Sequence, residues 1–201
     1  DRENDDSIRA AIANANTSWD ACIDCTGRTP KSAAQCVESI SRYTERFVVV
    51  STDSVYDPYH KTVPQDESNE HYLHDGGYGA TKRLMEEGFI ASEVNYTIFR
   101  PGHIFGESFQ LGCYPEHMRN PELLAHMRAD KPLQLVGGGK YLIHPIYARD
   151  YALTLIDCLD KPAAIHQIFC IGGPDVIPNS AYFECVGRII GHPAVIEELP
   201  E

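Results

Sequence analysis

Tyr78 and Lys82 are the two residues whose types and spacing most clearly indicate chemistry. They bound the stretch Tyr78-Gly-Ala-Thr-Lys82, and residues four apart share one face of a helix. A phenol titrates near ~10 in water, and a nearby cation favours its phenolate form. A tyrosine held in this way can exchange a proton with an alcohol or a carbonyl near neutral pH. The spacing also occurs on solvated helix faces, so the interpretation depends on what other residues add.

Two strand-like runs bring polar groups to the same region. The run Arg46-Phe-Val-Val-Val50 is rich in β-branched residues and predicts a buried parallel strand. It continues directly into the small hydroxyl residues Ser51 and Thr52. A second run, Tyr96-Thr-Ile-Phe-Arg100, ends in Pro101-Gly102, a pair that predicts a loop. Open α/β sheets bind ligands outside the carboxyl ends of their strands, so we expect these groups and the helical tyrosine and lysine to meet at one edge.

This ordered set resembles the extended short-chain dehydrogenase/reductase superfamily, in its NAD-dependent epimerase/dehydratase group, over essentially the whole chain. The Ser/Thr–Tyr–Lys triad of that family falls on Thr52, Tyr78 and Lys82. The resemblance implies that Tyr78 is the acid/base. It also implies that Lys82 lowers the pKa of this tyrosine and holds the nicotinamide ribose, and that Thr52 binds the reacting oxygen. The cofactor implied is NAD or NADP.

The same resemblance extends the site to neighbouring loops. The Arg-Pro-x-x-x-Tyr-Gly segment of the family matches Arg100 to Gly106, with Phe105 in the place of tyrosine. It implies substrate contacts for Asp53 and His103, although a packed loop histidine is an equal alternative for His103. The cofactor contacts that it implies, besides Tyr78 and Lys82, are Thr26, Gly27, Ser51 and Pro101.

The glycine-rich turn that normally receives the cofactor pyrophosphate is missing from the sequence. The family places a Gly-x-x-Gly-x-x-Gly turn before a helix N-terminus, and no such motif occurs here. The first residues, Asp1-Arg2, are similar to the family stretch just after its third strand. We therefore expect two strand–helix units to be absent from the amino end, either because the sequence is a fragment or because the natural chain is truncated.

The fold expected is α/β, a Rossmann-like doubly wound parallel sheet, truncated at its amino end, with a small carboxyl-terminal substrate lobe. Strands near 20–25 and 46–51 alternate with helices near 6–16, 31–44 and 78–89, a pattern typical of parallel sheets with helical crossovers. Residues 1–106 are predicted to form the partial NAD(P)-binding domain, and residues 107–201 a mixed lobe interleaved with the sheet. A loop over 57–77 covers the site. A later helix is predicted with one apolar face, formed by Ala152, Leu155, Ile156 and Leu159.

Composition excludes several classes of function. The net charge of −12 over 201 residues argues against nucleic-acid binding through phosphate contacts. No apolar run approaches the ~20 residues that span a bilayer, so no membrane partner is expected. The seven cysteines suit a reducing compartment, so a cytoplasmic location is expected. If the amino end is missing from the sequence, a targeting segment is missing with it.

Neither the cysteines nor the histidines predict a metal site. Cys22-Ile-Asp-Cys25 has the spacing of a redox motif, but it lies in a strand-like run rather than at the start of a helix. The nine histidines show no ligand spacing with a cysteine pair. We therefore expect no metal and no catalytic cysteine.

The residues around the triad limit the reactions and substrates that we expect for this chain. The dehydratase branch of the family carries Thr-Asp-Glu where this chain has Thr52-Asp53-Ser54, and serine is a poor base for eliminating water. Nucleotide-sugar enzymes of the family often place asparagine near His103 and arginine near Ile143, and an isoleucine cannot pair with a phosphate. Dehydration and a nucleotide-sugar substrate are both disfavoured.

Two hypotheses of different classes follow. The first is an NAD(P)-dependent oxidoreductase or epimerase that acts on a hydroxyl or carbonyl of a sugar-like or other small substrate, with Tyr78 moving the proton. The alternative is a non-catalytic scaffold, or a subunit of a larger assembly, that keeps the fold. Many relatives form homodimers through the tyrosine-bearing helix, so a homodimer through the Tyr78 helix is expected.

Overall fold

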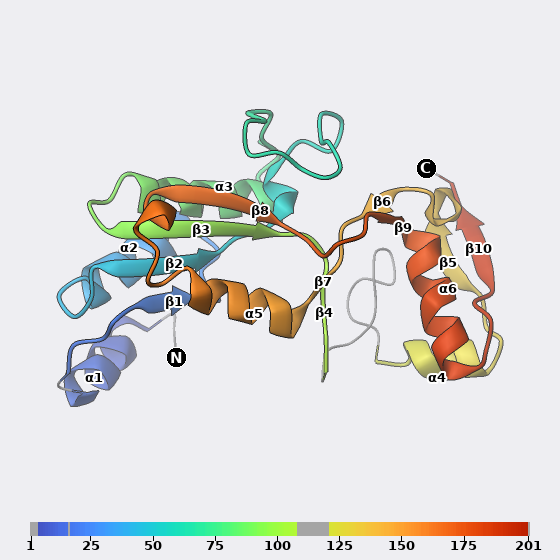
Figure 1. Ribbon diagram of the computed structural model, residues 1–201, viewed down its shortest axis with the longest axis horizontal. Coiled ribbons are helices and arrows are strands. Elements are labelled where there is room, and N and C mark those ends of the chain that lie inside the picture. Colours follow the sequence, from blue (N-terminus) through green and yellow to red (C-terminus); the bar gives the residue numbers. More distant parts are fainter. Residues whose placement is uncertain (1–3, 16, 108–120, 201) are drawn as a thin grey trace. The chain divides into compact units, whose positions relative to one another are not determined.

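The computed structural model describes residues 4–15, 17–107 and 121–200 (Figure 1). It divides into two compact units. The first unit comprises Asp1–Gly102 and Asp150–Ile171, and the second comprises His103–Arg149 and Gly172–Glu201. The division expected between residues 106 and 107 remains a prediction.

The first unit is built on a parallel sheet, which confirms the α/β class. Its strands are β1 (Cys22–Asp24), β2 (Arg46–Val50), β3 (Asn95–Pro101) and β8 (Gln167–Ile171), hydrogen-bonded in that order. All three pairings are parallel. The carboxyl ends of the four strands therefore lie along one edge, where the short helix η1 (Asp53–Val55) follows β2.

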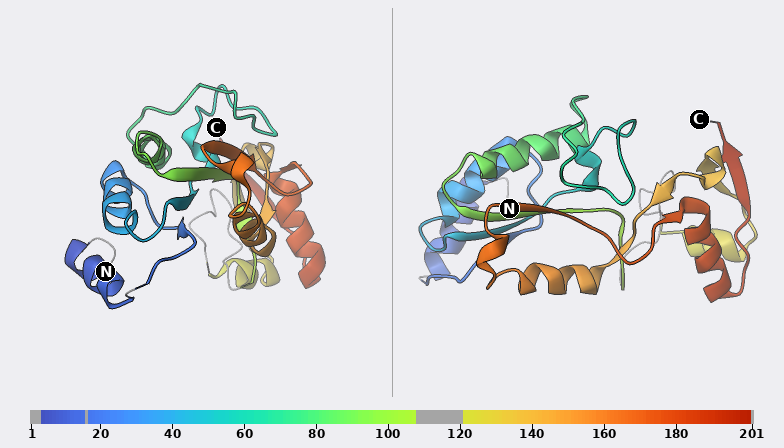
Figure 2. Two further views of the ribbon diagram at one scale, coloured as in Figure 1. Left: turned by 60° about the vertical axis from the view of Figure 1, so that its left-hand side comes forward. Right: turned by 45° about the horizontal axis from the view of Figure 1, so that its top comes forward.

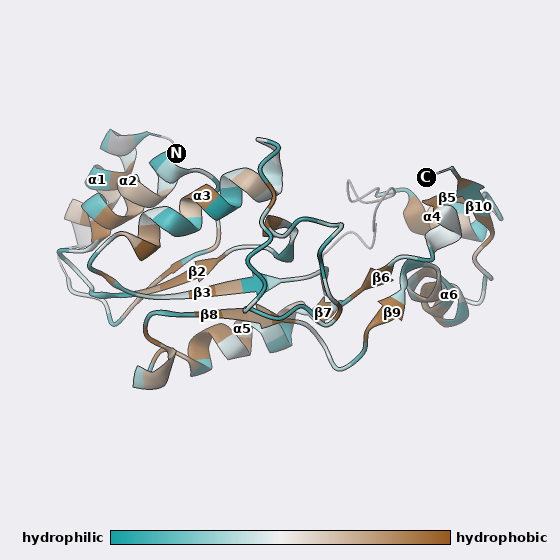
Figure 3. Ribbon diagram, turned by 90° about the horizontal axis from the view of Figure 1, so that it is seen from above, coloured by the Kyte–Doolittle hydropathy of each residue, from teal (hydrophilic) through white to brown (hydrophobic). Residues whose placement is uncertain are grey.

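Helices cover both faces of this sheet. The helices α2 (Pro30–Ile40) and α3 (Tyr78–Ile90) lie on one face and α5 (Ala148–Asp157) lies on the other (Figures 1 and 2), and α1 (Asp5–Ala15) precedes β1. The strands are largely hydrophobic (Figure 3). Burial of apolar surface between sheet and helices stabilises this unit. The residues of that core with no exposed surface include Phe47, Val49, Met85, Phe89 and Ile98.

Two elements are shorter than their predicted ranges. The strand β1 ends at Asp24 because its carboxylate accepts hydrogen bonds from the Thr26 and Gly27 N–H groups and turns the chain. The helix α2 begins after the cap Thr29, which forms a capping box with Ser32, and it ends at Ile40 rather than near 44. There the chain folds back in a turn, in which the Tyr43 N–H donates to the Ile40 carbonyl.

The predicted apolar face of α5 is wrong in two of its members. The buried side chains are Tyr151, Leu155 and Cys158, whereas Ile156 is 57% exposed and Ala152 is also exposed. Tyr151 sets this register because its ring packs edge-on against Phe99, with 6.3 Å between centroids. The helix presents the stripe that contains Tyr151 to the sheet.

The second unit consists of short elements around its own core. The strand β5 (Leu133–Val136) pairs in parallel with β10 (Ile196–Leu199), and α4 (Leu123–Arg128) and α6 (Asn179–Ile190) pack with them through Leu123, Met127, Leu135 and Phe183. Two small pairs are β4 (Ile104–Phe105) with β7 (Ile146–Tyr147) and β6 (Leu142–Ile143) with β9 (Ile177–Pro178). Short 3₁₀ helices occur at η2 (Gly137–Gly139) in this unit and at η3 (Pro162–Ala164) in the first. Among the helices that the structure describes, none is long and apolar enough to cross a membrane.

Candidate functional site

Lys82 ties α3 to the carboxyl ends of two neighbouring strands. Its side chain is buried, and its Nζ donates to the Gly27 carbonyl at 2.7 Å and to the Val50 carbonyl at 2.6 Å. A third, weaker contact joins Nζ to the Met85 Sδ at 3.8 Å. Burying an ammonium is costly unless hydrogen bonds compensate it, and these two carbonyls do so. The lysine cation is therefore fixed at the sheet edge that the sequence indicated.

The loop after β1 is shaped to offer one of those carbonyls. The Asp24 carboxylate accepts from the Thr26 N–H at 3.0 Å and from the Gly27 N–H at 2.9 Å. With its N–H turned toward Asp24, Gly27 presents its carbonyl to Lys82. Thr26 is exposed while Gly27 is buried. Two of the predicted cofactor contacts thus lie in the loop that holds the lysine.

Ser51 and Thr52, the two hydroxyl residues after β2, are both buried, but their side chains differ in hydrogen bonding. The Thr52 hydroxyl oxygen accepts from the Ser54 N–H and caps η1. The Ser51 N–H donates to the Phe99 carbonyl at 2.7 Å. The Ser51 Oγ is buried and, within the part of the chain that the structure describes, has no hydrogen-bond partner. Buried hydroxyls almost always find a partner, so this atom is suited to meet a ligand.

Tyr78 opens α3 and is 55% exposed. The next residue, Gly79, explains how the start of the helix reaches the Thr52–Ser54 segment, because a Cβ there would lie 1.8 Å from the Ser54 carbonyl oxygen. Only glycine permits this approach of two backbones. The close contact places Tyr78 beside the threonine loop and one turn before Lys82. Gly79 is thus a positioning residue that the sequence analysis did not single out.

The remaining predicted residues fall into different surroundings. Asp53 forms an ion pair with Lys61 of the loop 57–77, and both side chains are partly buried. Pro101 is buried at the end of β3, in register with Ile171 of β8. His103 begins the second unit, where its ring packs edge-on against Tyr182 at 5.3 Å. Its role as a substrate ligand remains a prediction.

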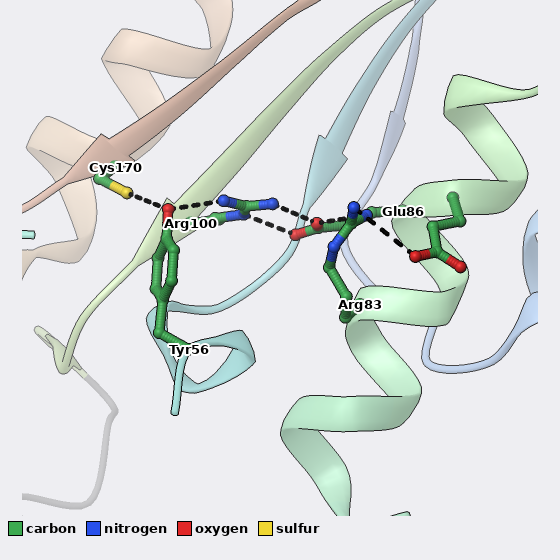
Figure 4. A network of polar contacts seen from close by, with 6 residues as sticks. Tyr56, Arg83, Glu86, Arg100 and Cys170 are labelled. Carbon is green, nitrogen blue, oxygen red and sulfur yellow. Dashed lines mark hydrogen bonds and ion pairs between the residues drawn. The ribbon is translucent and has the colours of Figure 1, made fainter. Parts of the chain in front are cut away.

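A buried polar network, shown in Figure 4, lies between α3 and β3. The Arg100 guanidinium donates two hydrogen bonds to the Glu86 carboxylate, at 3.0 and 2.7 Å, with 1% and 0% of the two side chains exposed. It donates a further hydrogen bond to the Tyr56 hydroxyl, which contacts the Cys170 Sγ at 3.3 Å. This bidentate pair locks the helix that carries Tyr78 and Lys82 onto the sheet.

Tyr56, Cys170 and Arg100 in this network each keep one ionisation state at physiological pH. Burial raises the pKa of the Tyr56 phenol and raises the pKa of the Cys170 thiol to about 11. Burial by itself would lower the pKa of Arg100, but the hydrogen bonds and charge of Glu86 outweigh that effect and raise it. Tyr56 and Cys170 therefore stay neutral at physiological pH, and the arginine keeps its charge.

The same network holds the loop 57–77. Tyr72 stacks on Tyr56 with 5.6 Å between ring centroids, and the guanidinium of Arg83 lies 4.4 Å from the centre of the Tyr72 ring. Glu67 accepts a hydrogen bond from the backbone N–H of Cys170 in β8. The loop is thus attached to both α3 and the sheet. The sequence analysis gave no signal for this arrangement, because its contacts join segments that are far apart in the chain.

The comparisons with known proteins come from sequence and from structure. The sequence model of the NAD dependent epimerase/dehydratase family matches residues 8–172. None of the curated proteins matches the chain.

Three solved structures illustrate the structural likeness. An epimerase, Mth375, from Methanothermobacter thermautotrophicus superposes with a TM-score of 0.80 at 15% identity, over 100% of this chain and 65% of that one. The UDP-glucose 4-epimerase of Thermotoga maritima, solved with UDP-glucose, gives 0.78 at 17% identity, over 100% and 70%. The dTDP-glucose 4,6-dehydratase of Bacillus anthracis, solved with NAD, gives 0.76 at 16% identity, over 100% and 66%. The chain therefore spans about two thirds of the length of these structures, and the likeness establishes the Rossmann-like fold.

Proposed function

The chain belongs to the NAD dependent epimerase/dehydratase family, and on this premise we propose that it contributes the acid–base half of an NAD(P)-dependent enzyme. The complete protein is an oxidoreductase or epimerase acting on a hydroxyl or carbonyl of a sugar-like or other small substrate. The observation that carries the proposal is the buried ammonium of Lys82, held between the carbonyls of Gly27 and Val50 one turn after Tyr78.

The residues at this edge fit the nicotinamide ribose of NAD or NADP. The Lys82 Nζ also contacts the Met85 Sδ at 3.8 Å, and a thioether is a weak acceptor that a ribose hydroxyl would replace. The buried Ser51 Oγ offers a second polar atom, and Thr26, Gly27 and Pro101 complete the contacts. When bound, the nicotinamide supplies the hydride chemistry.

Thr52 and Tyr78 handle the proton. The Thr52 oxygen accepts from the Ser54 N–H, and its own O–H can donate to a substrate oxygen. Tyr78, more than half exposed, exchanges its phenolic proton with the same oxygen. The fixed cation of Lys82 favours the phenolate that forms. General acid–base catalysis of this kind contributes about 10²–10⁴-fold.

The neighbours of Thr52 favour hydride chemistry over elimination of water. Asp53 is engaged by Lys61, and Ser54 carries no basic group. Dehydration needs an acid and a base at these two positions by resemblance to the dehydratase branch. We therefore place oxidation, reduction or epimerisation ahead of dehydration for this chain. The relatives solved with UDP-glucose or NAD support a sugar-like substrate.

A homodimer through α3 is the arrangement that we propose for the assembly. The apolar side chains of Leu84 and Ile90 on this helix are 48% and 37% exposed. A dimer through α3 would remove these apolar side chains from water. The alternative function, a non-catalytic scaffold, is supported by His103 and Ile143, which stand where nucleotide-sugar enzymes of the family often carry asparagine and arginine.

The test of the enzyme against the scaffold is the nucleotide that the natural protein carries. The protein is purified from its source, denatured, and any released nucleotide is identified by mass spectrometry. We expect NAD(H) or NADP(H), because the buried ammonium of Lys82 would hold the nicotinamide ribose in the complete protein. If no nucleotide is released, and none binds when either cofactor is added at millimolar concentration, the scaffold is correct.

A further inference from the structure

Cys22 of β1 and Cys36 of α2 lie side by side in the core of the first unit. Their Sγ atoms are 3.9 Å apart, and neither residue is in a disulfide. Cys36 is buried, with 5% exposed, and Cys22 is partly buried. A disulfide bond measures ~2.05 Å between sulfurs, so the two thiols lie about 2 Å from bonding distance and face each other.

The other nearby cysteine is a poorer partner for Cys22. Cys25 completes the Cys-x-x-Cys spacing, but residues Cys22–Asp24 form a strand, and an extended chain advances ~3.3 Å per residue. The strand therefore carries Cys25 away from Cys22 instead of folding it back, as the first turn of a helix would. Burial, with the charge of Asp24, also raises the pKa of the Cys25 thiol, which lowers its thiolate fraction.

We propose that Cys22 and Cys36 form a reversible disulfide that joins β1 to α2 when the protein meets a small-molecule disulfide such as oxidised glutathione. One cysteine thiolate attacks the S–S bond of the reagent, which forms a mixed disulfide and releases one reagent thiol. The second cysteine thiolate then attacks the protein sulfur of that bond and releases the other reagent thiol. The two protein thiols lose two electrons and two protons, and the reagent is reduced to two thiols.

The disulfide would close a ring around the loop that offers its carbonyl to Lys82. The segment between the two cysteines contains Asp24, Thr26 and Gly27, and the Gly27 carbonyl is bonded to the lysine ammonium. A cross-link restricts the conformations open to the loop that it encloses. The oxidation state of this pair thus sets how rigidly one wall of the proposed cofactor site is held. The chemistry itself rests on the sulfur geometry and not on the proposed function.

Trypsin distinguishes a disulfide to Cys36 from one between Cys22 and Cys25, because Arg28 and Lys31 lie between Cys25 and Cys36. The folded chain is treated with excess oxidised glutathione, remaining thiols are alkylated, and the digest is analysed by mass spectrometry without reduction. We expect the peptide of residues 10–28, alkylated at Cys25, to be joined to the peptide of residues 32–42. The pair should be lighter than the sum of these two peptides by two hydrogens and should separate on reduction.

Three cysteine variants identify which sulfurs form the disulfide. Cys25→Ser should keep the joined peptides, and Cys36→Ser should abolish them. Cys185→Ser, which removes an exposed cysteine of the second unit, is the matched control and should keep them. A disulfide confined to residues 10–28, loss of the joined peptides in Cys25→Ser, or complete alkylation of Cys22 and Cys36 in the wild-type chain would overturn the proposal.

Discussion

Replacing Tyr78 by phenylalanine is expected to lower turnover of the complete enzyme by about 10²–10⁴-fold, the usual contribution of a general acid–base group. The change removes one hydroxyl from a side chain that is 55% exposed, so the fold and its stability should be nearly unchanged. The measurement is the rate of hydride transfer between the nicotinamide nucleotide and a substrate of the wild-type protein, under saturating cofactor.

The loop 57–77 offers a matched control for this substitution. Tyr59 is 94% exposed, and Tyr59→Phe makes the identical chemical change away from the proposed proton path. We expect its turnover to equal that of the wild-type protein. Turnover in Tyr78→Phe within a factor of about two of the wild type, well inside the loss that a general acid–base group implies, would refute the assignment of the acid/base.

Glu86→Ala is expected to lower the free energy of unfolding by about 3–5 kcal/mol, which is typical when one partner of a buried ion pair is removed. The Arg100 side chain is 1% exposed and directs two hydrogen bonds to the Glu86 carboxylate. Without that carboxylate the guanidinium keeps only the neutral Tyr56 hydroxyl as a side-chain partner in the network drawn in Figure 4. Urea unfolding followed by circular dichroism measures the change.

The neighbouring residue Glu87 provides the control. It lies 3.6 Å from Arg83, and its side chain is 53% exposed, so Glu87→Ala should cost no more than about 0.5 kcal/mol. The double variant Glu86→Leu with Arg100→Met should be more stable than Glu86→Ala, because it does not leave the Arg100 guanidinium buried without its carboxylate partner. Equal effects of Glu86→Ala and Glu87→Ala would show that the network does not anchor α3.

The fold and the placement of Lys82 at the carboxyl edge of the sheet could be predicted from the sequence because both have local signatures. The β-branched run of β2 and the helical spacing of Tyr78 and Lys82 each depend on residues close together in the chain. The alternation of such segments is enough to indicate a parallel sheet. Chemical roles for Thr52 and Lys82 came from the family resemblance, and the carbonyl partners of Lys82 became visible only in three dimensions.

The features that were missed depend on contacts between distant segments. Apolar residues of α5 are compatible with two helix faces, and the packing of Tyr151 on Phe99 selects one of them. The network of Glu86, Arg100 and Cys170 joins three separate elements. The loop 57–77 has no periodicity, so nothing in the sequence pairs Lys61 with Asp53. Tertiary packing determines these contacts, because the local sequence carries no signal for them.

We propose that Lys82 holds the nicotinamide ribose, and an NADH titration followed by fluorescence tests this role most directly. The complete protein is compared with Lys82→Met and with the control Lys140→Met, whose side chain is 79% exposed in the second unit. Circular dichroism first establishes that each variant is folded at the temperature used. The loss of a charge-assisted hydrogen bond predicts a Kd at least about tenfold higher for Lys82→Met, and an unchanged Kd for Lys140→Met. An unchanged Kd in folded Lys82→Met would contradict the account.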